Sequence, residues 1–327
     1  MKRMYKRKRK REIRKKIPVK KFLPLLAVLS MIFPVFHAEA QAAGEATSVE
    51  KTMPSFDLTG KKILFVITSS DILGKSKEKT GYWLEEVAAP YEVLSKAGAE
   101  ITLASPKGGL PPVDAFSLRK RFLSDYTKEF KKDQKAQKAL ASTIPLDQVK
   151  AEDYDALYYP AGFGIFSDLV NNPTSINLIE SFSRAKKPMA FLCQAPAVLK
   201  NVKTAQGHEI VRGLNVTALR NSEEAGGAML RPYVWLVPPG MEALGNDLTY
   251  KREKLPEKEF LEKMDLKDKI PFLVETMLKQ EGANYEAKPN MASFTVTDVT
   301  ADKGFLITGQ NPYSAAEIAE KLASVMQ

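Results

Sequence analysis

Cysteine and histidine are the two residue types that this chain nearly lacks. Its 327 residues include one cysteine, Cys193, and two histidines, His37 and His208. A single cysteine cannot form a disulfide within the chain, so the thiol is buried, reactive or used between chains. There is no histidine pair, no EF-hand spacing of acidic residues, and no phosphate loop or dinucleotide fingerprint. We therefore expect no metal and no cofactor.

A run of apolar residues long enough to cross a membrane comfortably is also missing at the N-terminus. The run FLPLLAVLSMIFPVF at residues 22–36 is too short. It follows a strongly basic segment and precedes the small residues HAEAQA, which is the order of a secretory signal peptide. We predict that residues 1–40 are a signal peptide, cleaved after Ala40 or Ala42, and that the protein is secreted or extracytoplasmic. The alternative is an uncleaved membrane anchor.

The excess of positive charge belongs to this leader. Residues 1–40 carry 13 Lys and Arg against 2 Asp and Glu, a net of +11, so the whole-chain value of +10 leaves −1 for residues 41–327. A nearly neutral mature protein gives no reason to expect nucleic acid or an anionic membrane as a partner. The remaining partner classes are a small-molecule electrophile, a misfolded protein or a second copy of the chain in a homodimer.

The mature chain alternates apolar β-rich runs with segments of helical spacing. We predict strands at residues 61–70, 99–106, 154–164, 188–193 and 214–219 and two more within 292–310, and helices at 81–98, 172–187, after Pro196, 271–283 and 314–326. This order predicts an α/β flavodoxin-like sandwich, with a mainly parallel sheet and helices on both faces.

One domain at residues 61–327 accounts for this alternation, after a flexible lead-in at 41–60. An insertion at about 225–270 interrupts the pattern. Ser314, with Glu317 three residues later, predicts a capping box at the start of the last helix.

Several chemically useful residues follow the predicted strands. Ligands of open parallel sheets bind beyond the carboxyl ends of the strands. At those ends lie Glu85 and Glu86, the turn AGFG at residues 161–164, Cys193 in FLCQAP, and NSEE at residues 221–224. A cysteine between a strand and a helix is placed like a nucleophile, and the helix N-terminus is expected to lower its pKa. The alternative is a small buried side chain.

The segments that carry these residues resemble those of a known superfamily. The relevant stretches are TGYWLEEVAAPYEVLSKAGAEITLASPKGGLPPVD, YDALYYPAGFGIFSDL, FLCQAPAVL, GLNVTALRNSEE, PFLVETMLKQEGANY and LITGQNPYSA. Together they resemble the ThiJ/PfpI superfamily, which has the class I glutamine-amidotransferase-like fold. The branch they resemble holds heat-shock chaperones and glyoxalase III enzymes. The resemblance covers most of residues 61–327.

The resemblance implies a site built around the cysteine. In the family, a glutamate of the first helix hydrogen-bonds the elbow cysteine, and Glu86 occupies this position. The backbone N–H groups near Gly162, Gly164 and Gln194 are the expected oxyanion donors, although both glycines can serve the tight turn alone. Glu224, next to Glu223, matches the acidic residue that orients the family histidine; a helix-capping role is the alternative.

This chain departs from the family pattern at both histidine positions. The usual Cys-His-Gly-Pro reads Cys193-Gln194-Ala195-Pro196, and the usual Gly-His-Gly reads Gly162-Phe163-Gly164. The family's glyoxalase reaction converts methylglyoxal to lactate and needs an acid/base group, which Gln194 cannot be because it does not ionise. Glu86 or Glu224 is the candidate substitute, since His208 lies in a polar turn.

Two functional hypotheses follow from the kept cysteine and the missing histidines. The first is an exported thiol enzyme, a glyoxalase III-like lyase or hydrolase acting on small reactive carbonyls. The second is a non-enzymatic chaperone-like or redox-sensing protein on the same fold, with Cys193 as an oxidisable group. Glutamine amidotransfer is not expected, because it requires a Cys-His-Glu triad.

Overall fold

The computed structural model describes residues 55–230 and 256–327. The predicted signal peptide and the middle of the predicted insertion lie outside these ranges. The described strands are β1 (Lys62–Val66), β2 (Glu100–Ser105), β3 (Ile144–Pro145), β4 (Ala156–Tyr159), β5 (Met189–Leu192), β6 (Asn215–Val216), β7 (Asn284–Tyr285), β8 (Thr295–Val299) and β9 (Phe305–Gly309). The described α-helices are α4 (Leu84–Lys96), α5 (Asp125–Lys132), α6 (Gln134–Ala141), α7 (Ile165–Asp168), α8 (Pro173–Arg184), α9 (Asn221–Leu230), α11 (Glu257–Lys263), α12 (Val274–Gln280) and α13 (Ala315–Met326).

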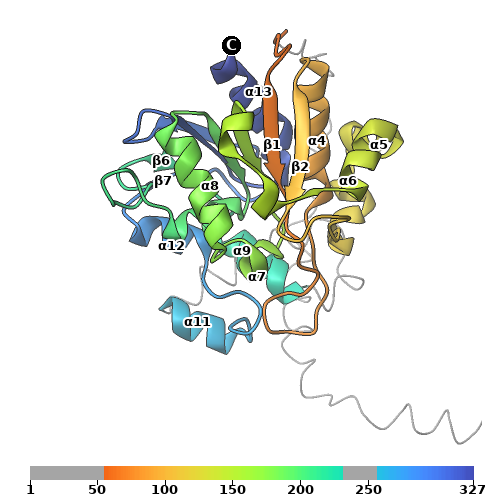
Figure 1. The fold of residues 1–327 in the computed structure, drawn as a ribbon. Coiled ribbons are helices and arrows are strands. Elements are labelled where there is room, and N and C mark those ends of the chain that lie inside the picture. Colours follow the sequence, from red (N-terminus) through yellow and green to blue (C-terminus); the bar gives the residue numbers. More distant parts are fainter. Residues whose placement is uncertain (1–54, 231–255) are drawn as a thin grey trace, which may run out of the picture. The chain divides into compact units, whose positions relative to one another are not determined.

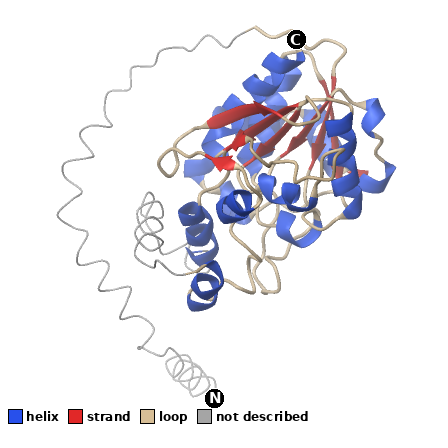
Figure 2. Ribbon diagram, turned by 90° about the vertical axis from the view of Figure 1, so that its left-hand side faces the viewer, coloured by secondary structure: helices blue, strands red, loops and turns tan. Residues whose placement is uncertain are grey.

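The predicted α/β sandwich with a mainly parallel sheet is confirmed. Seven strands form one sheet in the order β3-β2-β1-β4-β5-β9-β8, and β8 alone runs antiparallel to its neighbour. The central strands are buried on both faces, as β1, β4 and β5 must be when helices cover both sides. Helices α4 and α13 pack against each other on one face, and α8 contacts β4 and β5 on the other (Figure 1). Figure 2 shows the sheet between these helical layers.

The strand predicted at residues 214–219 does not join this sheet. Only Asn215 and Val216 are extended, as β6, and they pair with β7 in a separate two-stranded sheet. The place beside β5 is taken by β9, which is parallel to it, with Leu192 opposite Gly309. The apolar run alone did not reveal this, because a short buried strand looks the same in either sheet.

Both ends of the predicted insertion are helical, as α9 and α11, in the described part.

The predicted flexible lead-in at residues 41–60 is ordered at its end. Leu58 lies within it, yet its side chain is fully buried and its N–H donates to Ala97 O at 2.7 Å. None of the helices within the described ranges is long and apolar enough to cross a membrane.

The predicted capping box at the start of α13 is wrong. The Ser314 hydroxyl instead bonds the backbone N–H and carbonyl of Phe294, at 3.0 and 3.1 Å. The Glu317 carboxylate accepts hydrogen bonds from the hydroxyls of Ser293 and Thr295. Both side chains therefore fasten the start of β8 onto α13, and a long-range contact replaces the local cap that the spacing predicted.

A proline fixes the connection between α4 and the sheet. Pro90 lies inside α4 and has no N–H, so it cannot donate to the carbonyl of Glu86 four residues earlier. The Tyr158 hydroxyl, from β4, donates to that carbonyl at 2.7 Å. A buried carbonyl freed within the helix is thus satisfied by the neighbouring strand, which fixes the height of Glu86 relative to β4.

This arrangement predicts a rescue. Tyr158→Phe should lower the free energy of unfolding by about 1–3 kcal/mol, because it leaves the buried Glu86 carbonyl without a donor. In a Pro90→Ala background, position 90 regains an N–H for the same carbonyl, so Tyr158→Phe should cost clearly less. Chemical denaturation of the four variants of this cycle measures the coupling; equal costs in both backgrounds would contradict the assignment.

Candidate functional site

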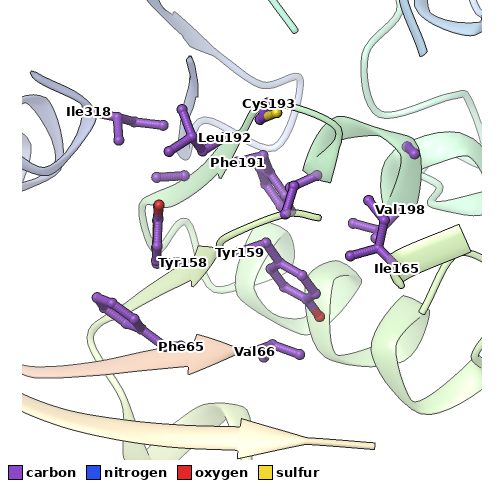
Figure 3. Packing of buried hydrophobic residues seen from close by; sticks show 14 of the residues in the cluster. Phe65, Val66, Tyr158, Tyr159, Ile165, Phe191, Leu192, Cys193, Val198 and Ile318 are labelled. Carbon is purple, nitrogen blue, oxygen red and sulfur yellow. The ribbon is translucent and has the colours of Figure 1, made fainter. Parts of the chain in front are cut away.

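Cys193 occupies a strained turn directly after β5. Its φ is 63°, a left-handed conformation that costs a non-glycine residue about 1–3 kcal/mol. Its N–H donates to Gly309 O at 2.8 Å, and its carbonyl accepts from Leu219 N at 2.8 Å. Figure 3 shows the sulfur just beyond Phe191 and Leu192, at the end of the buried strand. The surrounding chain therefore holds the thiol at the edge of the sheet where ligands bind.

Glu86 comes to the same place from the first turn of α4. Its side chain is fully buried, as the spacing of apolar residues around it predicted. Oε2 accepts from Ala161 N at 2.7 Å, which joins α4 to the glycine turn after β4. Oε1 has no hydrogen-bond partner among the described residues. An interaction with the nearby Cys193 thiol lowers the pKa of this carboxyl, but by less than burial raises it. Burial raises the pKa of Glu86 to about 8, so the group is mostly protonated at neutral pH.

The expectation that a helix N-terminus lowers the pKa of Cys193 is wrong. The thiol is only 3% exposed, and burial raises its pKa well above the usual value. The carboxyls of Glu86 and Glu223 raise it further, whereas the N–H of Gln194 lowers it. The segment that follows is a 3₁₀-helix at Ala195–Asn201, and its terminus does not outweigh burial and two carboxyls. Cys193 is therefore a protonated thiol at neutral pH.

Gln194 acts on the thiol as a neutral partner. The Cys193 Sγ lies 3.2 Å from Gln194 Oε1, to which it donates. Phe163, at the other position where the resemblance implies a histidine, is buried, and its ring lies 6.5 Å from the Phe166 ring, centroid to centroid. His208 is exposed on a turn where its carbonyl accepts from Thr204 N. Of the two histidines, only His208 is in the described part, and it is exposed, whereas the thiol is buried.

Gly162 and Gly164 are required by close backbone contacts. A Cβ on Gly162, whose φ is 118°, would lie 2.2 Å from Gly81 O, and one on Gly164 would lie 2.7 Å from Ser70 O. The glycine turn therefore packs tightly against the loops that follow β1 and precede α4. This close packing alone accounts for the two glycines. An oxyanion role for their N–H groups stays a prediction.

Glu224 binds the start of another helix. Its Oε2 accepts from Val274 N, the first residue of α12, at 2.8 Å. The side chain is fully buried, and Oε1 has no hydrogen-bond partner among the described residues. Burial, followed by the charges of Glu257 and Glu275, raises its pKa well above the usual range. The Glu224 carboxyl therefore caps α12, which is the helix-capping alternative. A proton-transfer role for Glu224 stays a prediction.

Glu223 is the carboxyl of this pair whose charge reaches the thiol, and the sequence did not single it out. It is bonded by Met291 N, Asn311 Nδ2 and Gln310 Nε2, and it raises the pKa of Cys193. The only signal in the sequence was its place in NSEE beside Glu224. Adjacent helical residues point about 100° apart, so the two side chains leave α9 in different directions.

The fold and this geometry agree with the comparison to known proteins. Residues 79–229 match the DJ-1/PfpI family. The chain carries a DJ-1/PfpI domain. Glyoxalase 3 of Candida albicans is 25% identical over 271 residues, covering 81% of this chain and 98% of that protein. Glutathione-independent glyoxalase HSP31 of Saccharomyces cerevisiae is 26% identical over 264 residues, covering 79% and 95%.

A solved structure is similar to this chain over more than residues 79–229. Rapid Encystment Protein 24 KDa of Francisella tularensis superposes with a TM-score of 0.65 at 26% identity. The match covers 82% of this chain and 99% of that one. Each of these three proteins aligns over nearly its whole length, so the similarity includes the ends of the strands where Cys193 and Glu86 meet.

The raised pKa of Glu224 predicts a pH-dependent stability. The folded state binds this proton more tightly than the unfolded chain, so its contribution is complete at low pH and declines as pH rises toward the raised pKa. Glu224→Gln keeps an acceptor for Val274 N without the charge. We expect it to stabilise the protein by on the order of 1–3 kcal/mol at pH 8 and to have little effect at pH 4.5. Thermal unfolding at both values tests this, and an equal gain at the two would contradict it.

The sole thiol allows a direct test of its coupling to Glu86. Glu86→Gln should lower the pKa of Cys193, because the Glu86 carboxyl raises it. The pH dependence of the rate of alkylation by iodoacetamide, followed into strongly alkaline solution, measures that pKa. Glu85→Gln is the matched control on the same turn, since Glu85 bonds Ser124 and is not among the groups that shift the thiol. A thiol pKa near 8.5 in the wild type would contradict the raised value.

Proposed function

We propose that this protein is a cysteine-dependent enzyme that acts on small reactive carbonyls, with a glyoxalase-like conversion of methylglyoxal to lactate as its reaction. The observation that carries the proposal is Cys193 held at a φ of 63° beside the buried Glu86. The two glyoxalases named above resemble the chain over about four fifths of its length, which supports the same substrate class.

The proposed reaction begins when the Cys193 sulfur adds to the aldehyde carbon and forms a hemithioacetal. A proton then moves between the two carbons, and water releases lactate from the resulting thioester. At neutral pH the Glu86 carboxyl is mostly protonated, so it can stabilise a developing thiolate by donating a hydrogen bond. Ala161 N fixes the other carboxyl oxygen, which orients the proton-bearing oxygen toward the site. Backbone N–H groups at Gly162 and Gln194 are the proposed oxyanion donors.

Redox sensing by Cys193 is less well supported. The thiolate is the form that oxidants attack, and the raised pKa keeps Cys193 protonated at neutral pH. The chaperone-like role and the export of the protein stay predictions, because both depend on features outside the described geometry.

A turnover assay with methylglyoxal tests the proposed function. We expect the wild type to form lactate and Cys193→Ser to lose at least about 1,000-fold in kcat/KM, because the nucleophile is removed. Gln194→His restores the residue that the resembling enzymes keep and should raise kcat by about 10–100-fold through a better proton carrier. Lactate formation that persists in Cys193→Ser would contradict the thiol mechanism. No turnover in the wild type, with a gain in Gln194→His, would identify a decayed glyoxalase site.

A further inference from the structure

Two backbone contacts of Cys193 bring the segments next to Glu223 to the elbow. The carbonyl of Cys193 bonds Leu219 N, and α9 begins two residues later and carries Glu223 in its first turn. The N–H of Cys193 bonds Gly309 O, and Gln310, the next residue, donates to Glu223 Oε2 at 3.4 Å. Segments on both sides of the cysteine therefore converge on this one carboxyl.

The carboxyl rests in a built polar cradle. Oε1 accepts from Met291 N at 2.7 Å and from Asn311 Nδ2 at 3.1 Å. Met291 has a φ of 66°, so its loop is strained into the position from which the N–H can reach Glu223. The Gln310 amide is itself fixed, since its Oε1 accepts from Lys288 N at 2.8 Å. The Arg220 backbone N–H also bonds this carboxyl, so the carboxyl is oriented from several sides.

The electrostatics suit proton transfer. Burial raises the pKa of Glu223 to about 7, against the opposing effects of its hydrogen bonds and of Arg220. This is the range in which histidine normally exchanges protons. The titratable and charged groups coupled to Glu223 are Arg220, Cys193 and Tyr285.

We propose that Glu223 accepts the proton that the Cys193 thiol releases as its sulfur adds to a carbonyl carbon, in place of the histidine that this chain lacks. The S–C bond forms and the C=O double bond becomes single. The proton passes from sulfur to the Glu223 carboxylate and then to the new alkoxide oxygen, so no oxidant or reductant is required. This inference rests on the proposed function and assigns its missing acid/base group.

The test combines two measurements on Glu223→Gln. Turnover of methylglyoxal should fall by about 100-fold or more, and the ionisation near pH 7 should disappear from the pH profile of kcat/KM. Alkylation of Cys193 at pH 8 should become faster, because the like charge beside the thiol is gone. A purely structural role for Glu223 would not make the thiol more reactive while turnover falls. Glu223→Asp keeps an ionisable group and should restore part of the activity.

Ser222→Ala is the matched control. The Ser222 hydroxyl bonds Asn290 Oδ1 at 2.9 Å, so its loss loosens the same loop without removing a titratable group. We expect its pH profile and alkylation rate to match the wild type. An active wild type with unchanged turnover and pH profile in Glu223→Gln would overturn the role of Glu223 alone. A wild type without turnover would overturn the proposed function, and alkylation that is unchanged in Glu223→Gln would overturn the coupling independently of any activity.

Discussion

The site depends on how Glu86 is held between α4 and β4. Its carbonyl accepts from Tyr158 because Pro90 leaves it without a helical donor, and its Oε2 accepts from Ala161 N. These two bonds fix the backbone of Glu86 to β4 and its side chain to the turn that follows β4. The free oxygen is left near Cys193, where burial keeps it protonated. A helix that ran one turn higher or lower would leave the thiol without this partner.

Burial and two neighbouring carboxyls act together on the thiol. Burial raises the pKa of Cys193, and Glu86 and Glu223 raise it further, so the thiol stays protonated at neutral pH. The next residue, Glu224, instead accepts a hydrogen bond from the N-terminus of α12. Two adjacent glutamates on one helix thus serve a candidate catalytic site and a structural contact.

The residues at the two positions where the resemblance implies histidines leave the fold intact. Gln194 occupies its position with a neutral hydrogen bond to the thiol, and Phe163 fills the other with an aromatic ring. The sheet and the elbow need only backbone bonds and apolar packing, which these substitutions leave intact. A proton carrier has to come from elsewhere in the site, and a carboxyl whose pKa is raised by burial meets that requirement.

The sequence by itself determined the alternation of strands and helices, the edge where Cys193 lies, and the burial of Glu86. These follow from local periodicity and from the geometry shared by parallel sheets. Only the tertiary structure decided that β9 lies beside β5, that Ser314 fastens β8 onto α13, and that the thiol has a raised pKa. It also decided that Glu223 acts on that pKa, whereas Glu224 binds the start of α12. Each of these depends on contacts between residues far apart in the chain, and local spacing carries no information about which groups meet or how much water is excluded around them.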